Sequence, residues 1–150
     1  IAVAYQEPLW QDGYAAEWIT DPGQGQKFLQ LCDCLEITKE ILNRPIRTYS
    51  SGEKCKVDVA RALSEASEIL LLDEPLNYMD VYFREQLERA ILAFCPTLVF
   101  VEHDERFADH VATRSINLEG GSGMSVQPTG RNNIRKNNMN YTNINKNRGK

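Results

Sequence analysis

The sequence has few of the features that mark membrane, secreted or metal-binding proteins. Its longest apolar runs, residues 69–72 and 97–101, fall far short of the roughly 20 residues that a membrane helix requires. No basic and apolar leader is present, and residue 1 is Ile, so we expect the chain to begin inside a longer protein. The cysteines lack the CxxC pairs of zinc sites, and we interpret them as reduced thiols of a soluble, cytoplasmic protein (Cys32, Cys34, Cys55 and Cys95).

Acidic residues are absent after Glu119, whereas six basic residues follow it. The formal net charge of −4 therefore divides into −10 for residues 1–119 and +6 for residues 120–150. Residues 1–119 are too acidic to present a nucleic-acid surface. The basic tail, in contrast, suits an anionic partner such as ribosomal RNA. Residues 131–150 hold eight asparagines and only isolated apolar side chains, so we predict that the tail, residues 120–150, is disordered.

Apolar periodicity in residues 1–119 predicts strands that alternate with helices. Short, continuously apolar runs are typical of strands buried on both faces of a parallel sheet. Apolar residues spaced three and four apart predict amphipathic helices between them. The predicted strands are residues 1–5, 69–72, 97–101 and 114–118, and the predicted helices are residues 26–35, 38–42, 50–63, 81–94 and 104–111. This order is typical of an α/β fold with a mostly parallel sheet, beside which residues 26–42 form a helical lobe.

Two adjacent carboxylates, Asp73 and Glu74, follow the apolar run 69–72. Ligands bind at the carboxyl ends of strands in open α/β sheets. Phosphoryl transfer needs a magnesium ion on the phosphate oxygens and a group that positions the attacking water. Because consecutive residues at a strand end point in different directions, Asp73 can serve the metal while Glu74 serves the water. A buried strand that simply meets an acidic turn is the alternative interpretation.

Two further clusters have the residue types of a phosphate site. Ser50, Ser51, Gly52 and Glu53 open a predicted helix, whose first backbone N–H groups and dipole attract anions. Serine is also an ordinary N-cap, so a simple capped helix explains the same residues. His103 follows the apolar run 97–101, where it can hydrogen-bond a γ-phosphate or have only a structural role.

The order and spacing of these clusters resemble those of the ATP-binding-cassette (ABC) ATPases. The family's signature, Leu-Ser-Gly-Gly-Gln, corresponds to Tyr-Ser-Ser-Gly-Glu at residues 49–53, and Asp73 and Glu74 match the Walker B carboxylates. His103 matches the switch histidine. The resemblance covers about residues 1–119, which it identifies as the C-terminal portion of an ABC domain of P-loop type. Its helical subdomain is expected at about residues 7–47.

The resemblance assigns roles to these residues and adds two more. Gln6 matches the Q-loop glutamine that contacts magnesium and senses nucleotide, and Asp80 matches the acidic position of the D-loop, residues 76–80. Two cassettes of this family enclose two ATP molecules head to tail. By resemblance, Glu74 orients the attacking water, Asp73 holds magnesium and His103 contacts the γ-phosphate. The signature residues close over ATP held by the second cassette (Ser50, Ser51, Gly52 and Glu53).

Two details are similar to the ABC-F branch, namely Glu53 in the signature and the Glu102-His103-Asp104 switch. Members of this branch are soluble twin-cassette proteins that work on ribosomes. Residues 49–61 and 100–107 most resemble the second cassette of antibiotic-resistance members, which protect ribosomes from lincosamide, pleuromutilin and streptogramin A drugs. Two alternatives remain: the nucleotide-binding subunit of an ABC membrane transporter, which shares the same catalytic residues, and an inactive fragment.

The 150 residues lack one motif of the family, and this absence leads to a testable expectation about ATP binding. They contain no Gly-x-x-x-x-Gly-Lys-Ser/Thr, the Walker A loop whose backbone and lysine hold the β- and γ-phosphates. Carboxylates without that loop repel a polyanion, so we expect this 150-residue chain to bind ATP very weakly and to hydrolyse none. Calorimetry on the purified chain measures the affinity, and a micromolar dissociation constant would contradict the expectation.

Overall fold

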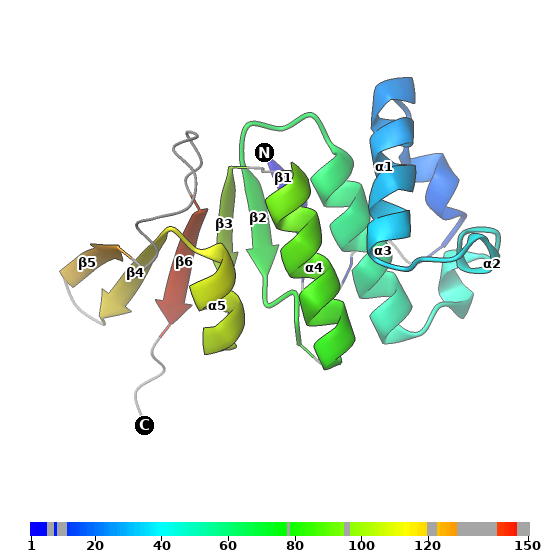
Figure 1. Ribbon diagram of the computed structural model, residues 1–150. Helices are drawn as coiled ribbons and strands as arrows, with labels where there is room; N and C mark the ends of the chain where they lie inside the picture. The colour runs from blue at the N-terminus through cyan, green and yellow to red at the C-terminus, as the bar shows by residue number, and fades with distance from the viewer. Residues whose placement is uncertain are drawn as a thin grey trace.

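A six-stranded, mostly parallel sheet is the central element of the structure, a computed structural model (Figure 1). It describes residues 1–5, 8, 12–77, 79–94, 97–119, 123–128 and 141–146. The strand order is β1-β2-β3-β6-β4-β5, in which only the pair β4 and β5 is antiparallel. The strands are β1 Ala2–Ala4, β2 Leu70–Asp73, β3 Leu98–Val101, β4 Arg114–Glu119, β5 Gly123–Pro128 and β6 Tyr141–Lys146. The α/β fold predicted from the sequence is confirmed.

The pairing of β2 with β3 places the two predicted apolar strands side by side. Leu70 lies opposite Leu98, and the register continues to Asp73 opposite Val101. Leu70 is buried, whereas Leu71 on the other face is only partly buried. Burial on both faces, as the continuous apolar run predicts, is therefore wrong for this part of the chain. The described residues cover one face of the sheet more completely than the other.

Helices cover the sheet and extend away from it on one side (Figure 1). α3 packs against β1 and β2, and α1 packs against α3 and α4. α1 and α2 lie at the end of the molecule opposite β4 and β5, where the sequence predicts a helical lobe. The α-helices are α1 Pro22–Cys34, α2 Lys39–Leu42, α3 Ser51–Ser64, α4 Val81–Phe94 and α5 Glu105–Val111, and the 3-10 helices are η1 Ala15–Trp18 and η2 Ile46–Thr48.

Side-chain caps determine where the helices next to the predicted site begin. The Ser50 hydroxyl accepts a hydrogen bond from the Glu53 N–H, and the Glu53 carboxylate accepts one from the Ser50 N–H. This reciprocal pair is a capping box, which satisfies two N–H groups at the start of α3. The Asp104 carboxylate caps α5 by accepting a hydrogen bond from the Phe107 N–H, as the sequence predicts.

The buried apolar core includes residues of β1, β2 and β3 and of helices α1, α3, α4 and α5. α4 buries four of the five positions that its apolar periodicity predicts (Phe83, Leu87, Ala90 and Ile91), whereas the fifth, Phe94, is only partly buried. Phe100 of β3 and Phe107 of α5 contact each other edge to face, with ring centroids 5.4 Å apart. Among the described residues, no helix combines the length and the apolar character needed to cross a bilayer.

The segment that the sequence predicts to be disordered contains two strands. β5 pairs antiparallel with β4, and β6 lies between β3 and β4, parallel to both. The prediction of a wholly disordered tail is therefore wrong for residues 123–128 and 141–146. A strand added to a sheet gains backbone hydrogen bonds that do not depend on a strong apolar pattern, so composition alone did not indicate it.

The fully buried Phe83 and its neighbour Tyr82, which is 74% exposed, offer a matched test of the core. We expect Phe83→Ala to lower the free energy of unfolding by about 3 to 5 kcal/mol, because it removes a buried ring and leaves a cavity. We expect Tyr82→Ala to change it by no more than about 0.5 kcal/mol. Urea denaturation followed by circular dichroism measures both, and equal effects would contradict this packing.

Candidate functional site

The two predicted carboxylates lie at the carboxyl end of β2. Asp73 ends the strand and is exposed. The Glu74 N–H donates to the Val101 carbonyl at 3.0 Å, which extends the β2–β3 pairing by one residue. Glu74 has a φ of 48°, in the left-handed region that non-glycine residues seldom adopt. Such strain in the backbone clusters at functional sites, and here it turns the chain sharply after the strand.

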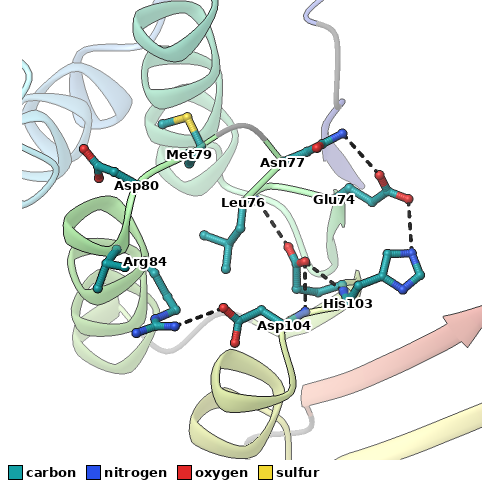
Figure 2. Close-up of a pocket in the computed structure, with 10 residues that line it drawn as sticks. Glu74, Leu76, Asn77, Met79, Asp80, Arg84, His103 and Asp104 are labelled. Carbon is teal, nitrogen blue, oxygen red and sulfur yellow. Dashed lines mark hydrogen bonds and ion pairs between the residues drawn. The ribbon is translucent and has the colours of Figure 1, made fainter.

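Glu74 and His103, both predicted to be catalytic, come together at this edge (Figure 2). The Nε2 atom of His103 lies 3.6 Å from the Glu74 Oε1 atom, close but beyond hydrogen-bonding distance. The His103 side chain is 61% exposed and that of Glu74 is 31% exposed, so a ligand can reach both. The Asn77 amide contacts the other Glu74 oxygen at 3.5 Å. Sequence reasoning did not single out Asn77.

Glu102 is the second residue that sequence reasoning did not place in the site. Its side chain is 7% exposed, and its carboxylate accepts hydrogen bonds from three backbone N–H groups. One oxygen binds the N–H groups of His103 and Asp104, at 2.8 and 3.3 Å, and the other binds the Leu76 N–H at 3.2 Å. A carboxylate at the end of an otherwise apolar strand was the available signal, but the contact with Leu76 spans 26 residues.

A pocket of about 250 Å³ opens beside these residues (Figure 2). Asp80 lines it, and the Asp80 carboxylate accepts a hydrogen bond from the Phe83 N–H at the start of α4. Asp104 also lines it and accepts a hydrogen bond from Arg84 at 3.0 Å, which joins α5 to α4. Burial would raise the pKa of the Asp104 carboxyl, but hydrogen bonds from Phe107 and Arg84 outweigh burial and lower the pKa.

The predicted signature residues lie at the start of α3, outside the described lining of this pocket. Ser50 and Ser51 are exposed there. The Glu53 carboxylate is occupied, because it accepts from the Ser50 N–H and from Arg44 at 2.6 Å. Burial would raise the pKa of Glu53, but these hydrogen bonds outweigh it and lower the pKa. The acid in the signature is therefore neutralised within the chain.

Gly52 is not required by the packing around it. A Cβ atom built at this position would meet the Met79 sulfur at 3.6 Å, an ordinary van der Waals distance. Because packing within the chain leaves space for a Cβ atom here, the glycine suits a position that an external group approaches closely. The structure places this position on α3, next to the segment that carries Asp80.

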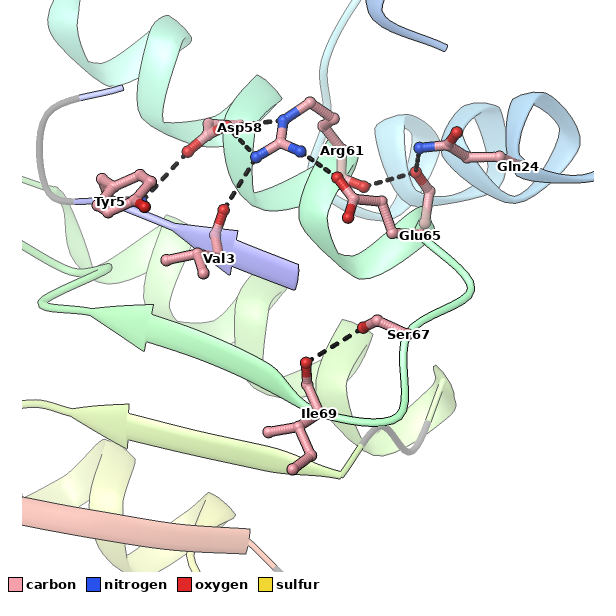
Figure 3. A network of polar contacts seen from close by, with 9 residues as sticks. Val3, Tyr5, Gln24, Asp58, Arg61, Glu65, Ser67 and Ile69 are labelled. Atoms are coloured by element: carbon pink, nitrogen blue, oxygen red, sulfur yellow. Dashed lines mark hydrogen bonds and ion pairs between the residues drawn. The ribbon is translucent and has the colours of Figure 1, made fainter. Parts of the chain in front are cut away.

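A buried polar network joins α3 to β1 (Figure 3). Asp58 is 1% exposed and accepts a hydrogen bond from the Tyr5 N–H at 3.3 Å. Arg61 binds Asp58 at 2.9 Å and donates to the Val3 carbonyl at 2.9 Å. Gln6 itself lies outside the described residues, so its predicted contact with magnesium stays a prediction.

The exposed carboxylate of Asp73 fits the needs of a magnesium ion. Magnesium prefers oxygen ligands and is commonly held by one or two carboxylates together with phosphates and water. Among the described residues, no hydrogen bond or ion pair engages the carboxylate of Asp73, so its oxygens are available. No group of three or more metal-binding side chains occurs in the described ranges. The residues therefore fit an ion bound jointly with a phosphate ligand.

A comparison with protein families matches residues 1–77, just over half of the chain, to the family described as ABC transporter. The chain belongs to this family. The matched residues run from β1 through α3 and β2 to Asn77, so they include residues 50–53 and the two carboxylates Asp73 and Glu74. Family membership implies nucleotide binding, typically with magnesium.

Similar proteins include an ABC transporter F family member and an archaeal ribosome recycling factor. The putative ATP-binding protein YdiF of Bacillus subtilis is 34% identical over 103 residues, which are 67% of this chain and 16% of YdiF. ABC transporter F family member 5 of Arabidopsis thaliana is 32% identical over 107 residues, 71% of this chain and 15% of that protein. A solved structure of the archaeal ribosome recycling factor aABCE1, in complex with the ribosomal stalk protein aP1, gives a TM-score of 0.63 at 28% identity. It covers 83% of this chain and 26% of the aABCE1 chain. The chain thus spans a small part of each relative.

The contact between Asp104 and Arg84 predicts a pH-dependent contribution to stability. Because the folded-state pKa of Asp104 is lowered, its contribution is fully present above the ordinary aspartate pKa of about 3.9 and is lost as pH falls through the folded-state pKa. We expect Asp104→Asn, which can still cap α5, to lower the free energy of unfolding at pH 7 by at most about 1 kcal/mol.

Urea denaturation of the wild type and of Asp104→Asn across the acidic pH range measures the difference in their free energies of unfolding. This difference should disappear once Asp104 is protonated in the folded wild type. Asp109→Asn, at an exposed position of the same helix, is the control and should show no such trend. A difference between wild type and Asp104→Asn that is constant with pH would contradict the prediction.

Proposed function

We propose that the chain is the C-terminal portion of an ATP-hydrolysing cassette in an ABC-F protein that acts on the ribosome. The main support is that the His103 Nε2 atom lies 3.6 Å from the Glu74 Oε1 atom, beside the exposed Asp73. A water-positioning carboxylate, a histidine within reach of a phosphate and a free metal-binding carboxylate are the parts that phosphoryl transfer to water needs. Hydrolysis of ATP is therefore the chemistry that suits this edge of the sheet.

Each residue has a distinct part in the proposed reaction. Asp73 holds magnesium, which, when bound, neutralises charge on the phosphate oxygens. Glu74 accepts a hydrogen bond from the attacking water and orients it toward the γ-phosphate. His103 donates to a γ-phosphate oxygen, and because no hydrogen bond joins it to Glu74, the Glu74 carboxylate remains free to accept from the water. The Walker A loop of the complete cassette supplies the phosphate cradle.

The exposed start of α3 supports a second cassette as partner. Ser50 and Ser51 present hydroxyl groups at the positive end of the α3 dipole, and Gly52 permits close approach of a phosphate. These residues lie outside the described lining of the pocket beside Glu74. We propose that they close over ATP held by another cassette of the same full-length, cytoplasmic protein, and that Asp80 lies at that interface.

Resemblance supports a finer proposal about the biological role. The Glu102-His103-Asp104 switch and Glu53 are similar to antibiotic-resistance members of the ABC-F branch. The solved relative aABCE1 is named as a ribosome recycling factor. We extend the proposal to the second cassette of a protein that protects ribosomes from lincosamide, pleuromutilin and streptogramin A drugs, with ribosomal RNA as the contact of the basic tail.

Glu74→Gln in the full-length protein tests the proposal. The substitution keeps the shape but removes the charge that orients water, so turnover should fall on the order of 10²-fold or more while ATP still binds. ATP then holds the two cassettes closed, and closure creates the ribosome-binding shape. We expect the variant to co-sediment with ribosomes when ATP is present and much less without it.

Glu85→Gln, at an exposed position of α4, is the matched control and should hydrolyse ATP normally. Ordinary turnover in Glu74→Gln would show that Glu74 has another role. Variant protein that follows a partner into the membrane fraction and leaves ribosomes free would indicate a transporter subunit, while the ATPase assignment would stand.

A further inference from the structure

We infer that Glu102 is a positioning residue that sets the distance between Glu74 and His103. Its carboxylate joins the segment after β2 to the segment after β3, through one oxygen on the Leu76 N–H and the other on the N–H groups of His103 and Asp104. The inference rests on the proposed ATPase function, to which it adds a residue that acts through the backbone of the two segments.

The geometry excludes a purely local role for this carboxylate. A residue that only stabilised its own turn would need the contacts with His103 and Asp104, one and two positions along the chain. The contact with Leu76 joins a segment 26 residues away. Leu76 lies two residues after Glu74, whose N–H is bound to the Val101 carbonyl. Glu74 is therefore held on both sides by the end of β3, at Val101 and at Glu102.

Burial makes this connection stiff. Glu102 is 7% exposed, so water competes little for its oxygens, and each of the three N–H groups would lose its partner if the side chain moved. The side chains of Glu74 and His103 are themselves more exposed and 3.6 Å apart, with no direct hydrogen bond to hold them together. Their relative position depends on the backbone that carries them, and Glu102 joins the two backbones.

An amide cannot replace this carboxylate. Both carboxylate oxygens accept hydrogen bonds, whereas glutamine has one accepting oxygen and one donating NH₂ group. In Glu102→Gln the NH₂ group must face either the Leu76 N–H or the N–H pair of His103 and Asp104. Two donors then face each other, and one of the two segments is released while the side-chain volume is preserved.

Steady-state ATP hydrolysis by the full-length protein tests the role. We expect Glu102→Gln to lower kcat by about tenfold or more, because small displacements of catalytic groups are costly, with KM for ATP changed less than about twofold. The control Glu105→Gln, exposed on α5, should leave both constants unchanged. In a His103→Ala background, Glu102→Gln should lower kcat by less than about twofold, since the distance between Glu74 and His103 that Glu102 sets no longer exists there. An equal loss in both backgrounds, or no loss in the wild type, would overturn the inference.

Amide hydrogen exchange separates this inference from the ATPase proposal. The N–H groups of Leu76, His103 and Asp104 should be protected in the wild type, and in Glu102→Gln at least one side of the contact should exchange about tenfold faster or more. Glu102→Ala, which removes both oxygens, should release both sides, while the amides of α3 stay protected. Unchanged exchange in both variants overturns the inference. If the Glu102 variants speed up exchange as expected but the wild-type protein hydrolyses no ATP, the connection made by Glu102 would be supported and the ATPase proposal would be rejected.

Discussion

Asp73 lies opposite Val101 because β2 and β3 are parallel and in register, and the arrangement of the candidate site follows from that pairing. The residues after the two strands leave the sheet side by side, which places Glu74 next to the turn that carries His103. Alternation along β3 decides which side chains face the core. Leu98 and Phe100 are buried, Val99 and Val101 are only partly buried, and Glu102 continues the buried side. A slip of one residue would bury His103 and expose Glu102, and would separate the residues proposed for catalysis.

The carboxyl edge of the sheet concentrates negative charge, and the structure compensates for it unevenly. Glu102 is satisfied by three N–H groups, and Asp104 by the Phe107 N–H and Arg84. Asp73 has no such partner within the described ranges and is exposed. Glu74 has only a long contact with the Asn77 amide and a neighbouring His103. The two acids that the fold needs are thus neutralised internally, whereas the two acids proposed for catalysis are left for a cation and a water molecule.

Periodicity and capping were sufficient to predict most of the fold from the sequence. Short, continuously apolar runs predicted β2 and β3, and apolar residues spaced three and four apart predicted α4. Asp104 was expected to begin α5 because its side chain acts over three residues. The contact of Glu102 with Leu76 was not predictable, because it depends on strand pairing between distant segments. Strands β5 and β6 were missed for a related reason, since backbone hydrogen bonds to a sheet edge leave little trace in composition. The pairing of Glu53 with Arg44 likewise depends on how the helical lobe packs.

The pairing of Glu53 with Arg44 ties the start of α3 to the helical lobe. Glutamine at position 53 could still accept from the Ser50 N–H and complete the capping box, but it could not form an ion pair with Arg44. Arg44 follows α2, in the helical lobe, and its guanidinium also lies over the Tyr49 ring, 5.6 Å from the centroid. The first turn of α3 is therefore held to the lobe by a charge-assisted hydrogen bond at 2.6 Å. Farther along the same helix Arg61 donates to the Val3 carbonyl of β1, so α3 is tied both to the lobe and to the sheet.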